Sequence, residues 1–434
     1  MNPEFIHDLV GIGIGPFNLG LAALCSDIPD LSCIFFDQST EFNWHPGMMI
    51  ADAKMQVPFY ADLTTVIDPK SHFTFLNYLK EKGRMFRFAN RECIMPYRRE
   101  YNNYCKWTAS QLSSLRFNSK VTSVDFDEAS GLFRVHVLDL AKNETLSCLT
   151  RHIVLGIGTE PLVPSCVNGI NHAFIFHSSE YLHRKKEILN LPSVSIIGSG
   201  QSAGEIYRDL LNYDSFENLS WFTKSERFYP MESTKLSYEM TSPDFINFFH
   251  SLEVGKKEQL LGKLDALYKG INASLINDIF DTLDLKFLAQ EKLPFHIMTS
   301  TELKSVMVSG SEIEIQLHHC FLEESFTHKT SALILATGYK PRYPAFLKNV
   351  QERITWLKPN LFSVTKNYSV DVTGKQIFVQ NAELHTHGFS APDLGMGPYR
   401  NATILNTILG YEHFKLEKNT TFQNFGQYFK ELKN

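Results

Sequence analysis

Residues 8–37, DLVGIGIGPFNLGLAALCSDIPDLSCIFFD, predict a dinucleotide-binding βαβ unit. A short apolar run leads into a glycine-rich turn, a helical pattern follows, and a second apolar run, 33–36, ends in Asp37. The glycines let the backbone approach a pyrophosphate at the positive end of the helix, and the acid is placed to accept hydrogen bonds from a ribose. The turn residues expected to contact the cofactor are Gly11, Gly13, Gly15, Pro16 and Asn18.

A second glycine turn lies in residues 191–205, LPSVSIIGSGQSAGE, and repeats the same order of elements. The apolar run 194–197 predicts a strand, and the sequence from Gln201 onward predicts a helix. The strand predicted next ends without an acid, and Lys224 and Arg227 follow it. Basic residues there suit the 2′-phosphate of NADP, although an ordinary solvated loop could carry the same two residues.

The composition is that of a globular protein of 434 residues, 43% of them hydrophobic and 21% charged. A net charge of −5 gives no reason to expect nucleic acid as a partner. The seven cysteines form no CxxC motif, which favours free thiols in a reducing compartment and a cytoplasmic location. The uncharged stretch 9–26 contains glycines and a proline and follows no basic region, so we expect no membrane span. We also expect no metal site, because the histidine pairs 318–319 and 385–387 lack a full ligand set.

The patterns along the chain predict an α/β fold with two Rossmann-like dinucleotide-binding domains and a mostly helical substrate-binding insert. We expect helices over 73–82, 100–115 and 400–409, and strands over 121–126, 132–138, 194–197, 219–222 and 377–379. Segment 38–69 is irregular but too apolar for disorder, so we expect it to be functional, and 385–399 is expected to be a loop. The expected domains are a FAD domain over 1–160 and 335–434, an NADPH domain over 161–240 and 291–334, and the insert over 241–290.

Two nucleotide units in one chain predict hydride transfer from NADPH to a tightly held flavin. The electrons then leave to an acceptor. A redox-active dithiol would need a CxxC motif, and the scattered cysteines cannot hold an iron–sulfur cluster. Dioxygen remains as the natural acceptor.

A series of motifs then runs nearly end to end along the chain. They are Gly13-x-Gly15-Pro16-x-Asn18-Leu19, Phe42-x-Trp44-His45-x-Gly47-Met48, Met55-Gln56, Phe73-x-Phe75-Leu76-x-Tyr78-Leu79, His177-Ser178-Ser179-x-Tyr181, Gly198-x-Gly200-Gln201-Ser202-Ala203-x-Glu205, Ala336-Thr337-Gly338-Tyr339 and Thr386-His387-Gly388. Each motif is weak alone, but in this order they are specific. The chain resembles the flavin-dependent N-hydroxylating monooxygenases of siderophore biosynthesis, the lysine and ornithine N-monooxygenase family.

The resemblance implies that NADPH reduces bound FAD, that dioxygen adds at flavin C4a to give a hydroperoxide, and that a neutral primary amine attacks its distal oxygen. It also implies a homotetramer. The protein then has to exclude water, hold the amine near the flavin and favour its unprotonated form. The implied catalytic residues are Gln56 and Asn272, the latter near the substrate amine and the nicotinamide ribose.

The resemblance assigns further residues by position. Contacts to FAD are implied for Asp37, Gln38, Trp44, His45, Gln56, Val121, Pro392, Asp393 and Leu394. Contacts to NADPH are implied for Ser199, Gly200, Gln201, Ser202 and Arg227, with Lys224 beside them. Thr337 and Gly338 are expected at the cofactors as well.

Departures from the family pattern concern the substrate. The family lysine that pairs with the substrate carboxylate falls on Ala61, its asparagine near the α-amino acid end on Tyr238, and its serine near the C-terminal loop on Gly395. All three changes remove polar partners from the carboxylate end, and alanine cannot offset the cost of burying a carboxylate. We therefore expect an amine that lacks a carboxylate: histamine, with a narrow preference because Tyr238 could stack on an imidazole, or a diamine such as putrescine or cadaverine.

Other functions remain open on the sequence. Lysine or ornithine stays a substrate if another residue replaced the missing lysine. A Baeyer–Villiger or sulfide-oxidising flavin monooxygenase would share both nucleotide units, and a non-catalytic redox-sensing flavoprotein would hold FAD without oxidising NADPH. A disulfide reductase is disfavoured by the missing dithiol.

Overall fold

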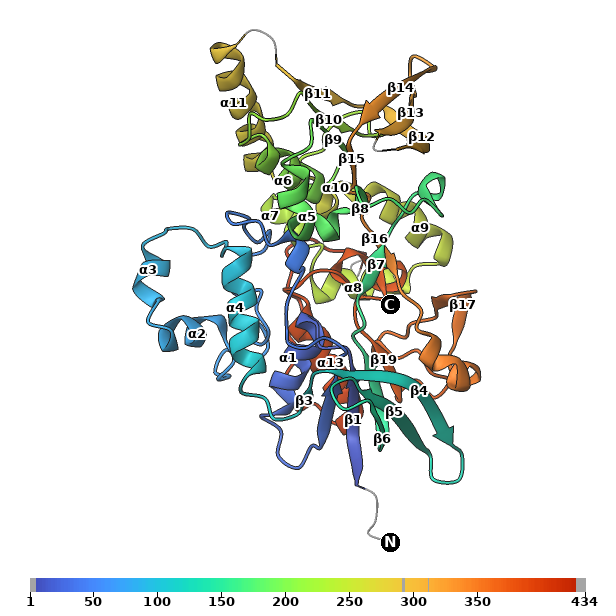
Figure 1. Cartoon of the computed structure of the whole chain (residues 1–434). Coiled ribbons are helices and arrows are strands. Elements are labelled where there is room, and N and C mark those ends of the chain that lie inside the picture. The colour runs from blue at the N-terminus through green and yellow to red at the C-terminus, as the bar shows by residue number, and fades with distance from the viewer. Residues whose placement is uncertain (1–4, 291–292, 311, 427–434) are drawn as a thin grey trace.

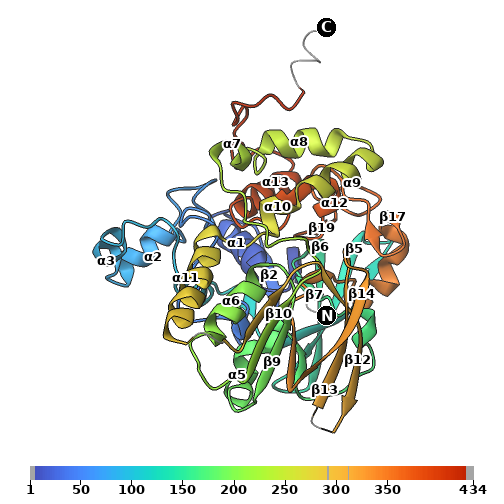
Figure 2. The same ribbon diagram turned by 90° about the horizontal axis from the view of Figure 1, so that it is seen from above.

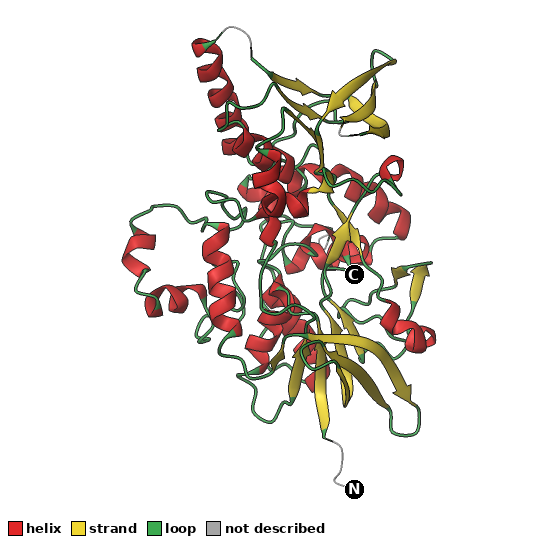
Figure 3. Cartoon of the chain, viewed as in Figure 1, coloured by secondary structure: helices red, strands yellow, loops and turns green. Residues whose placement is uncertain are grey.

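The computed structural model describes residues 5–290, 293–310 and 312–426. The expected domain ranges also contain residues 1–4, 291–292, 311 and 427–434, which lie outside the described residues. The chain has an α/β fold with two separate sheet regions, and helices and loops occupy the zone between them (Figures 1 and 3).

The first sheet is built around β1, the strand that precedes the first glycine turn. Its strands lie in the order β3-β2-β1-β6-β5-β4, and β19 pairs with β6. Strand β1 is parallel to β2 and β6, whereas β4, β5 and β6 form an antiparallel meander. The bounds are β1 Ile6–Ile12, β2 Cys33–Phe36, β3 Leu115–Arg116, β4 Ser119–Asp127, β5 Leu132–Asp139, β6 Glu144–Leu155 and β19 Ile377–Val379.

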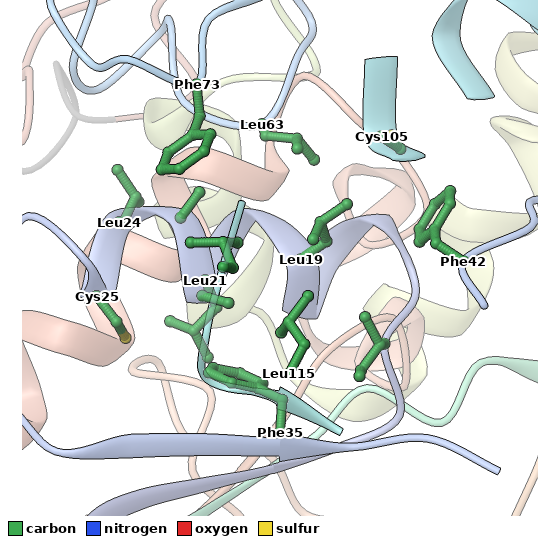
Figure 4. Close-up of a cluster of buried hydrophobic side chains, with 14 of the residues drawn as sticks. Leu19, Leu21, Leu24, Cys25, Phe35, Phe42, Leu63, Phe73, Cys105 and Leu115 are labelled. Carbon is green, nitrogen blue, oxygen red and sulfur yellow. The ribbon is translucent and has the colours of Figure 1, made fainter. Parts of the chain in front are cut away.

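Helix α1 (Pro16–Cys25) lies against this sheet and is buried along most of its length. Its side chains Leu19, Leu21 and Leu24 are fully buried and belong to a core cluster with Phe35 and Phe73 (Figure 4). Burial of each such side chain contributes about 1.5–3 kcal/mol. This packing holds the N-terminus of α1, with its free N–H groups, beside the glycine turn.

The second sheet is parallel and has the order β11-β10-β9-β15-β8. Helix α6 (Gln201–Leu210) follows β9 directly, as the second glycine motif predicts. An antiparallel sheet, β12-β13-β14, packs beside it. The bounds are β8 Ile175–His177, β9 Ser193–Ile197, β10 Asn218–Phe222, β11 Phe295–Met298, β12 Thr301–Ser309, β13 Glu312–His319, β14 Glu324–Thr330 and β15 Ala332–Leu335.

Two short strands, β7 (Thr159–Pro161) and β16 (Tyr339–Pro341), run between the sheet regions and pair antiparallel. The helical insert packs on the C-terminal segment, where Phe245 and Phe249 form a cluster with Phe389. In Figure 2, α8 and α9 lie over this segment. The helices concerned are α8 Pro243–Ser251, α9 Val254–Lys263, α10 Asp265–Tyr268, α11 Ala273–Ala289, α12 Leu384–His387 and α13 Gly397–Leu409.

The remaining elements connect or flank these sheets and helices. The helices are α2 Phe75–Glu81, α3 Met85–Ala89, α4 Arg98–Ala109, α5 Tyr181–Ile188 and α7 Lys235–Tyr238, the strands are β17 Trp356–Lys358 and β18 Leu361–Phe362, and 3₁₀ turns cover 46–48, 165–167, 178–180, 345–353 and 388–390. Among the described helices, none combines the length and the apolar character needed to cross a bilayer.

Two expected boundaries are wrong. The helix expected over 100–115 ends at Ala109, because Leu115 pairs with Phe35 and extends the first sheet. The loop expected over 385–399 contains α12 and the first turn of α13. A proline at the second position of a helix removes no intrahelical hydrogen bond, so Pro398 is compatible with this start.

Candidate functional site

The first glycine turn has the backbone geometry that a bound dinucleotide needs. Gly13 has φ +88°, and a Cβ there would lie 2.4 Å from the carbonyl oxygen of Gly156. A Cβ on Gly15 would meet nothing within 4 Å, so this side of the turn is open. Asp37 accepts a hydrogen bond from the backbone N–H of Ile14 at 2.7 Å and braces the turn. The turn therefore fits a pyrophosphate beside the N-terminus of α1.

The structure shows what two of the predicted turn residues contact within the protein, while their contacts to the cofactor stay predictions. Gly11 lies inside β1, and a Cβ there would collide with the ring of Phe35 at 2.0 Å, so this glycine serves strand packing. Asn18 is completely buried; its amide donates to the carbonyl of Gly13 at 2.8 Å, and its Oδ1 accepts from Gln380 at 2.5 Å. The side chain of Asn18 therefore stabilises the glycine turn from inside the protein, because both of its polar atoms are hydrogen-bonded to other residues of the chain.

The second glycine turn is similar. Gly198 has φ +147°, and a Cβ there would lie 2.2 Å from the carbonyl oxygen of Ala336. Gly200 caps α6, and a Cβ on it would come no closer than 3.5 Å to its neighbours. Lys224 and Arg227 are exposed just beyond β10, as a site for a 2′-phosphate requires.

The loop 42–49 brings the two sheet regions together. A Cβ on Gly47 would lie 1.7 Å from the carbonyl oxygen of Ser179, so only glycine permits this approach. His45 has φ +46°, and its ring lies 6.0 Å from the ring of Tyr339. The loop therefore meets residues near β8 and β16, between the two glycine turns.

His45 remains neutral at this junction. Surrounding protein and the guanidinium of Arg98 lower the pKa of His45 to about 4, although its side chain still reaches solvent. Trp44 lies beside it, at 5.1 Å between ring centroids, and its backbone N–H donates to Asn102 at 2.8 Å.

Gln56 provides an unsatisfied polar group. Its Nε2 is buried and has no hydrogen-bond partner within the described part of the chain. Buried polar groups in native proteins nearly always have partners. The orphaned donor therefore fits a bound cofactor or substrate.

Two of the three positions that depart from the family pattern, Ala61 and Gly395, meet in space. A Cβ on Gly395 would lie 3.4 Å from the Cβ of Ala61 and 3.0 Å from Oδ1 of Asp393. The backbone N–H of Met396 donates to the same oxygen at 3.1 Å. Burial raises the pKa of Asp393, and main-chain donors and Arg400 offset part of that increase. A small residue thus stands at the place of the missing lysine, and Gly395 contacts both it and the carboxyl group of Asp393.

Asn272 and Tyr238 differ in how well they are anchored. Asn272 caps α11, where its Oδ1 accepts from the N–H of Ser274 at 2.9 Å. Tyr238 is 49% exposed on α7, and α7 is tied to the C-terminal segment, where Gln423 donates to the carbonyl of Leu236. The predicted role of Tyr238 in substrate binding stays a prediction.

The other predicted cofactor residues fall into two groups. The side chain of Val121 is buried in a core cluster, which leaves its main chain for the predicted contact. The hydroxyl of Thr337 donates to the carbonyl of Leu162 at 2.5 Å and stabilises the β7–β16 ribbon. Contacts to cofactors stay predictions for Pro16, Asp37, Gln38, Trp44, His45, Ser199, Gln201, Ser202, Gly338, Pro392, Asp393 and Leu394.

Sequence reasoning missed a buried ion pair between Arg98 and Glu205. Glu205 belongs to a quoted motif, but no spacing indicates a partner 107 positions away. It also missed that Ala61 and the carboxyl group of Asp393 both lie near Gly395, because no spacing indicates that Ala61 approaches this segment. Among the described residues, no group of three histidine, cysteine or carboxylate side chains could hold a metal ion.

Comparison with known proteins decides the family. The model of L-lysine 6-monooxygenase/L-ornithine 5-monooxygenase matches residues 5–341. The chain belongs to this family. The monooxygenase is 45% identical over 423 residues to a putrescine N-hydroxylase from Shewanella oneidensis, with 97% of this chain and 84% of that protein covered.

Solved structures agree with this assignment. The FAD-bound cadaverine monooxygenase of desferrioxamine biosynthesis from Erwinia amylovora is 43% identical, with a TM-score of 0.93 over 97% of this chain and 98% of that one. The ornithine N-hydroxylase of Kutzneria, seen with reduced FAD, NADP⁺ and L-ornithine, is 26% identical, with a TM-score of 0.87 over 94% and 99% of the two chains. The protein is thus a flavin-dependent N-monooxygenase, as the sequence motifs predict.

Proposed function

We propose that this monooxygenase hydroxylates one nitrogen of an unbranched diamine of the putrescine and cadaverine class, for a hydroxamate-type siderophore. The observation that carries the proposal is that a Cβ on Gly395 would lie 3.0 Å from the carboxyl oxygen Oδ1 of Asp393 and 3.4 Å from the Cβ of Ala61. The balanced reaction is R–NH₂ + O₂ + NADPH + H⁺ → R–NHOH + NADP⁺ + H₂O.

A diamine places opposite demands on its two ends. The nitrogen that reacts must lose its proton, whereas the other nitrogen stays an ammonium ion and needs an anionic partner when water is excluded. Asp393 offers that partner, because its two main-chain donors leave other lone-pair sites free. An ammonium beside it would hold the carboxyl group ionised despite its burial. The carboxylate of lysine or ornithine would instead meet a like charge.

A neighbouring acid, Asp62, does not suit this role. Its Oδ1 accepts from the N–H groups of Thr64 and Thr65, and its Oδ2 accepts from the Thr65 hydroxyl and the N–H of Phe75, at 2.6–3.0 Å. These four bonds fill the acceptor sites of the carboxylate. Asp62 therefore shapes the loop, and Asp393 remains to bind the substrate.

Two further arguments favour a diamine over histamine. The similar enzymes from Shewanella and Erwinia are named for putrescine and cadaverine. Tyr238, which was expected to stack on an imidazole, is half exposed on α7. Of the two expected substrate classes, the diamines are therefore preferred.

In this proposal the two sheet regions act as the FAD and NADPH domains, with bounds as predicted above and 241–290 as the substrate insert. FAD, reduced by NADPH, supplies the activated oxygen. Gly13 and Gly15 hold one dinucleotide and Gly200 the other. Gln56 and Asn272 orient the reactants between them, and the neutral His45 adds no charge that would repel an ammonium substrate.

The test compares putrescine, cadaverine, histamine, lysine and ornithine with the wild type, Asp393→Asn and Ala61→Lys. We expect Asp393→Asn to lower kcat/KM for both diamines by about 100-fold, as for loss of a buried charged hydrogen bond. Asp52→Asn, in an exposed residue of the same loop as Ala61, is the control and should leave kcat/KM unchanged. FAD content is measured in every variant.

Each outcome bears on a different part of the proposal. Wild-type product from lysine or ornithine would overturn the diamine assignment and keep the reaction. Unchanged diamine kinetics in Asp393→Asn would remove Asp393 from the site, and unchanged selectivity in Ala61→Lys would remove the argument from the missing lysine. FAD binding without NADPH oxidation would favour a redox-sensing flavoprotein, whereas NADPH oxidation without any hydroxylamine would mean that the true substrate is missing from the panel.

A further inference from the structure

A buried ion pair joins the two halves of the molecule and takes no part in the chemistry described above. Arg98, the first residue of α4, donates from Nη1 and Nη2 to the two carboxylate oxygens of Glu205 on α6, at 2.9 and 2.8 Å. The side chains are only 12% and 6% exposed. Nη1 also donates to the carbonyl of Met48 at 2.8 Å. Arg98 therefore fastens loop 42–49 to the helix that follows the second glycine turn.

The chain of hydrogen bonds continues from this pair toward the site. The Nε2 of Gln201 donates to Glu205 at 2.9 Å, one helical turn away. The Oε1 of Gln201 accepts from the backbone N–H of Asn272 at 2.8 Å. Four residues from α4, α6 and the start of α11 are thus connected without a break.

The Arg98–Glu205 pair is buried, although burial of charged side chains is unfavourable. Burial of two charges has a high desolvation cost, and only good geometry with further hydrogen bonds compensates for it. Here the geometry is bidentate, and the additional partners are Met48 and Gln201. Pairs of hydrophobic residues give equal stability at lower desolvation cost. Such a pair is better explained by the geometry it imposes than by stability.

We propose that Arg98 and Glu205 are positioning residues that fix the distance and angle between the first and second glycine turns, and that orient Asn272 through Gln201. They touch neither reactants nor cofactors themselves. The proposal rests on the role of Asn272 in the proposed function, but not on which amine is the substrate.

The test replaces both charges together, with Arg98→Met/Glu205→Met, because removal of one partner would leave a buried charge unpaired. The control is Arg208→Met/Asp278→Met, which removes a more exposed pair that joins α6 to α11, at 2.6 and 3.3 Å. Each double variant loses one arginine and one carboxylate: one of the two comes from α6, and the other comes from the helix to which α6 is paired. Only the first loses the link to α4.

We expect the Arg98/Glu205 double variant to fold and to bind FAD, but to bind NADP⁺ about tenfold more weakly. The coupling, which is the amount of hydroxylamine formed per NADPH oxidised, should fall about tenfold. Calorimetric titration measures NADP⁺ affinity, and hydrogen exchange should be faster in peptides that contain the N–H of Asn272. The Arg208/Asp278 control should match the wild type in NADP⁺ affinity and in hydroxylamine yield.

Wild-type NADP⁺ affinity, coupling and hydrogen exchange in the double variant would overturn the proposal. Equal losses in the control would also overturn it, because packing of α6 and not the link between halves would then be responsible. If the double variant fails to bind FAD, the proposal is tested with Arg98→Lys instead. This variant keeps the positive charge but cannot form the bidentate hydrogen bonds. Wild-type coupling in Arg98→Lys would contradict the proposal, and intermediate coupling would support it. Failure of the diamine assignment would leave all these readouts valid with whichever amine is turned over.

Discussion

Single residues in the glycine turns carry separable roles in folding and in cofactor binding. Gly13 has a positive φ and a crowded Cβ position, whereas Gly15 has φ −83° and open space around it. We expect Gly13→Ala to lower the free energy of unfolding of the FAD-free protein by about 1–3 kcal/mol. Gly15→Ala should leave that stability unchanged and weaken FAD binding. Thermal unfolding without FAD measures the stability of each variant, and the additional stabilisation on adding FAD measures FAD binding. Equal destabilisation of the FAD-free protein by the two variants would contradict the separate roles of the two glycines.

The buried His387 is expected to make stability depend on pH. It is 1% exposed, and burial, with the nearby His250 and Arg400, lowers its pKa well below 6.5, against a raising effect of the Lys366 carbonyl. The unfolded chain therefore takes up a proton near pH 6.5 that the folded chain refuses. Stability is retained above that pH and falls below it, by up to about 1.4 kcal/mol per pH unit. Urea titrations at several pH values measure the free energy of unfolding. Below pH 6.5 this free energy should fall less steeply with decreasing pH in His387→Gln than in the wild type. An identical pH dependence in the two proteins would exclude this histidine as a cause.

At the scale of elements, helix α8 of the insert is defined by its cap. Ser242 is 6% exposed, and its hydroxyl accepts from the N–H of Phe245 at 3.2 Å, while Pro243 begins the helix. We expect Ser242→Ala to reduce the free energy of unfolding by about 1 kcal/mol, and Ser242→Asp to retain most of it. Chemical denaturation provides the measurement. Equal loss in both variants would mean that the site does not act as a cap.

For the whole molecule, the homotetramer implied by the family resemblance stays a prediction. Helix α11 exposes Phe280, Phe287 and Leu288, at 68%, 52% and 76%. Exposed apolar side chains in such numbers on one element are typical of contact surfaces. Light scattering on the purified protein should give the mass of four chains of 49.7 kDa, and the mass of one chain would contradict the prediction.

Element positions near strong local signals were predictable, and those that depend on distant partners were not. Strands 33–36 and 377–379 have the predicted bounds, because their apolar runs are sharply limited by polar residues. The end of α4 was not predictable, since Leu115 leaves the helical pattern only to pair with Phe35 in the sheet. The hydrogen-bond partner of Asn18 was not predictable for a related reason: Gln380 lies 362 positions away.

Sequence patterns alone indicate two dinucleotide-binding turns, a resemblance to the N-hydroxylating monooxygenases, and the absence at position 61 of the lysine for a substrate carboxylate. These features are local, because they depend on glycine conformations and on residues a few positions apart. That Gly395 lies near both Ala61 and the carboxyl group of Asp393, and that Arg98 reaches Glu205, follows from the three-dimensional fold. Charged residues far apart in the chain become partners only when the packed core brings their helices and strands together. Their separation along the sequence does not indicate such a contact.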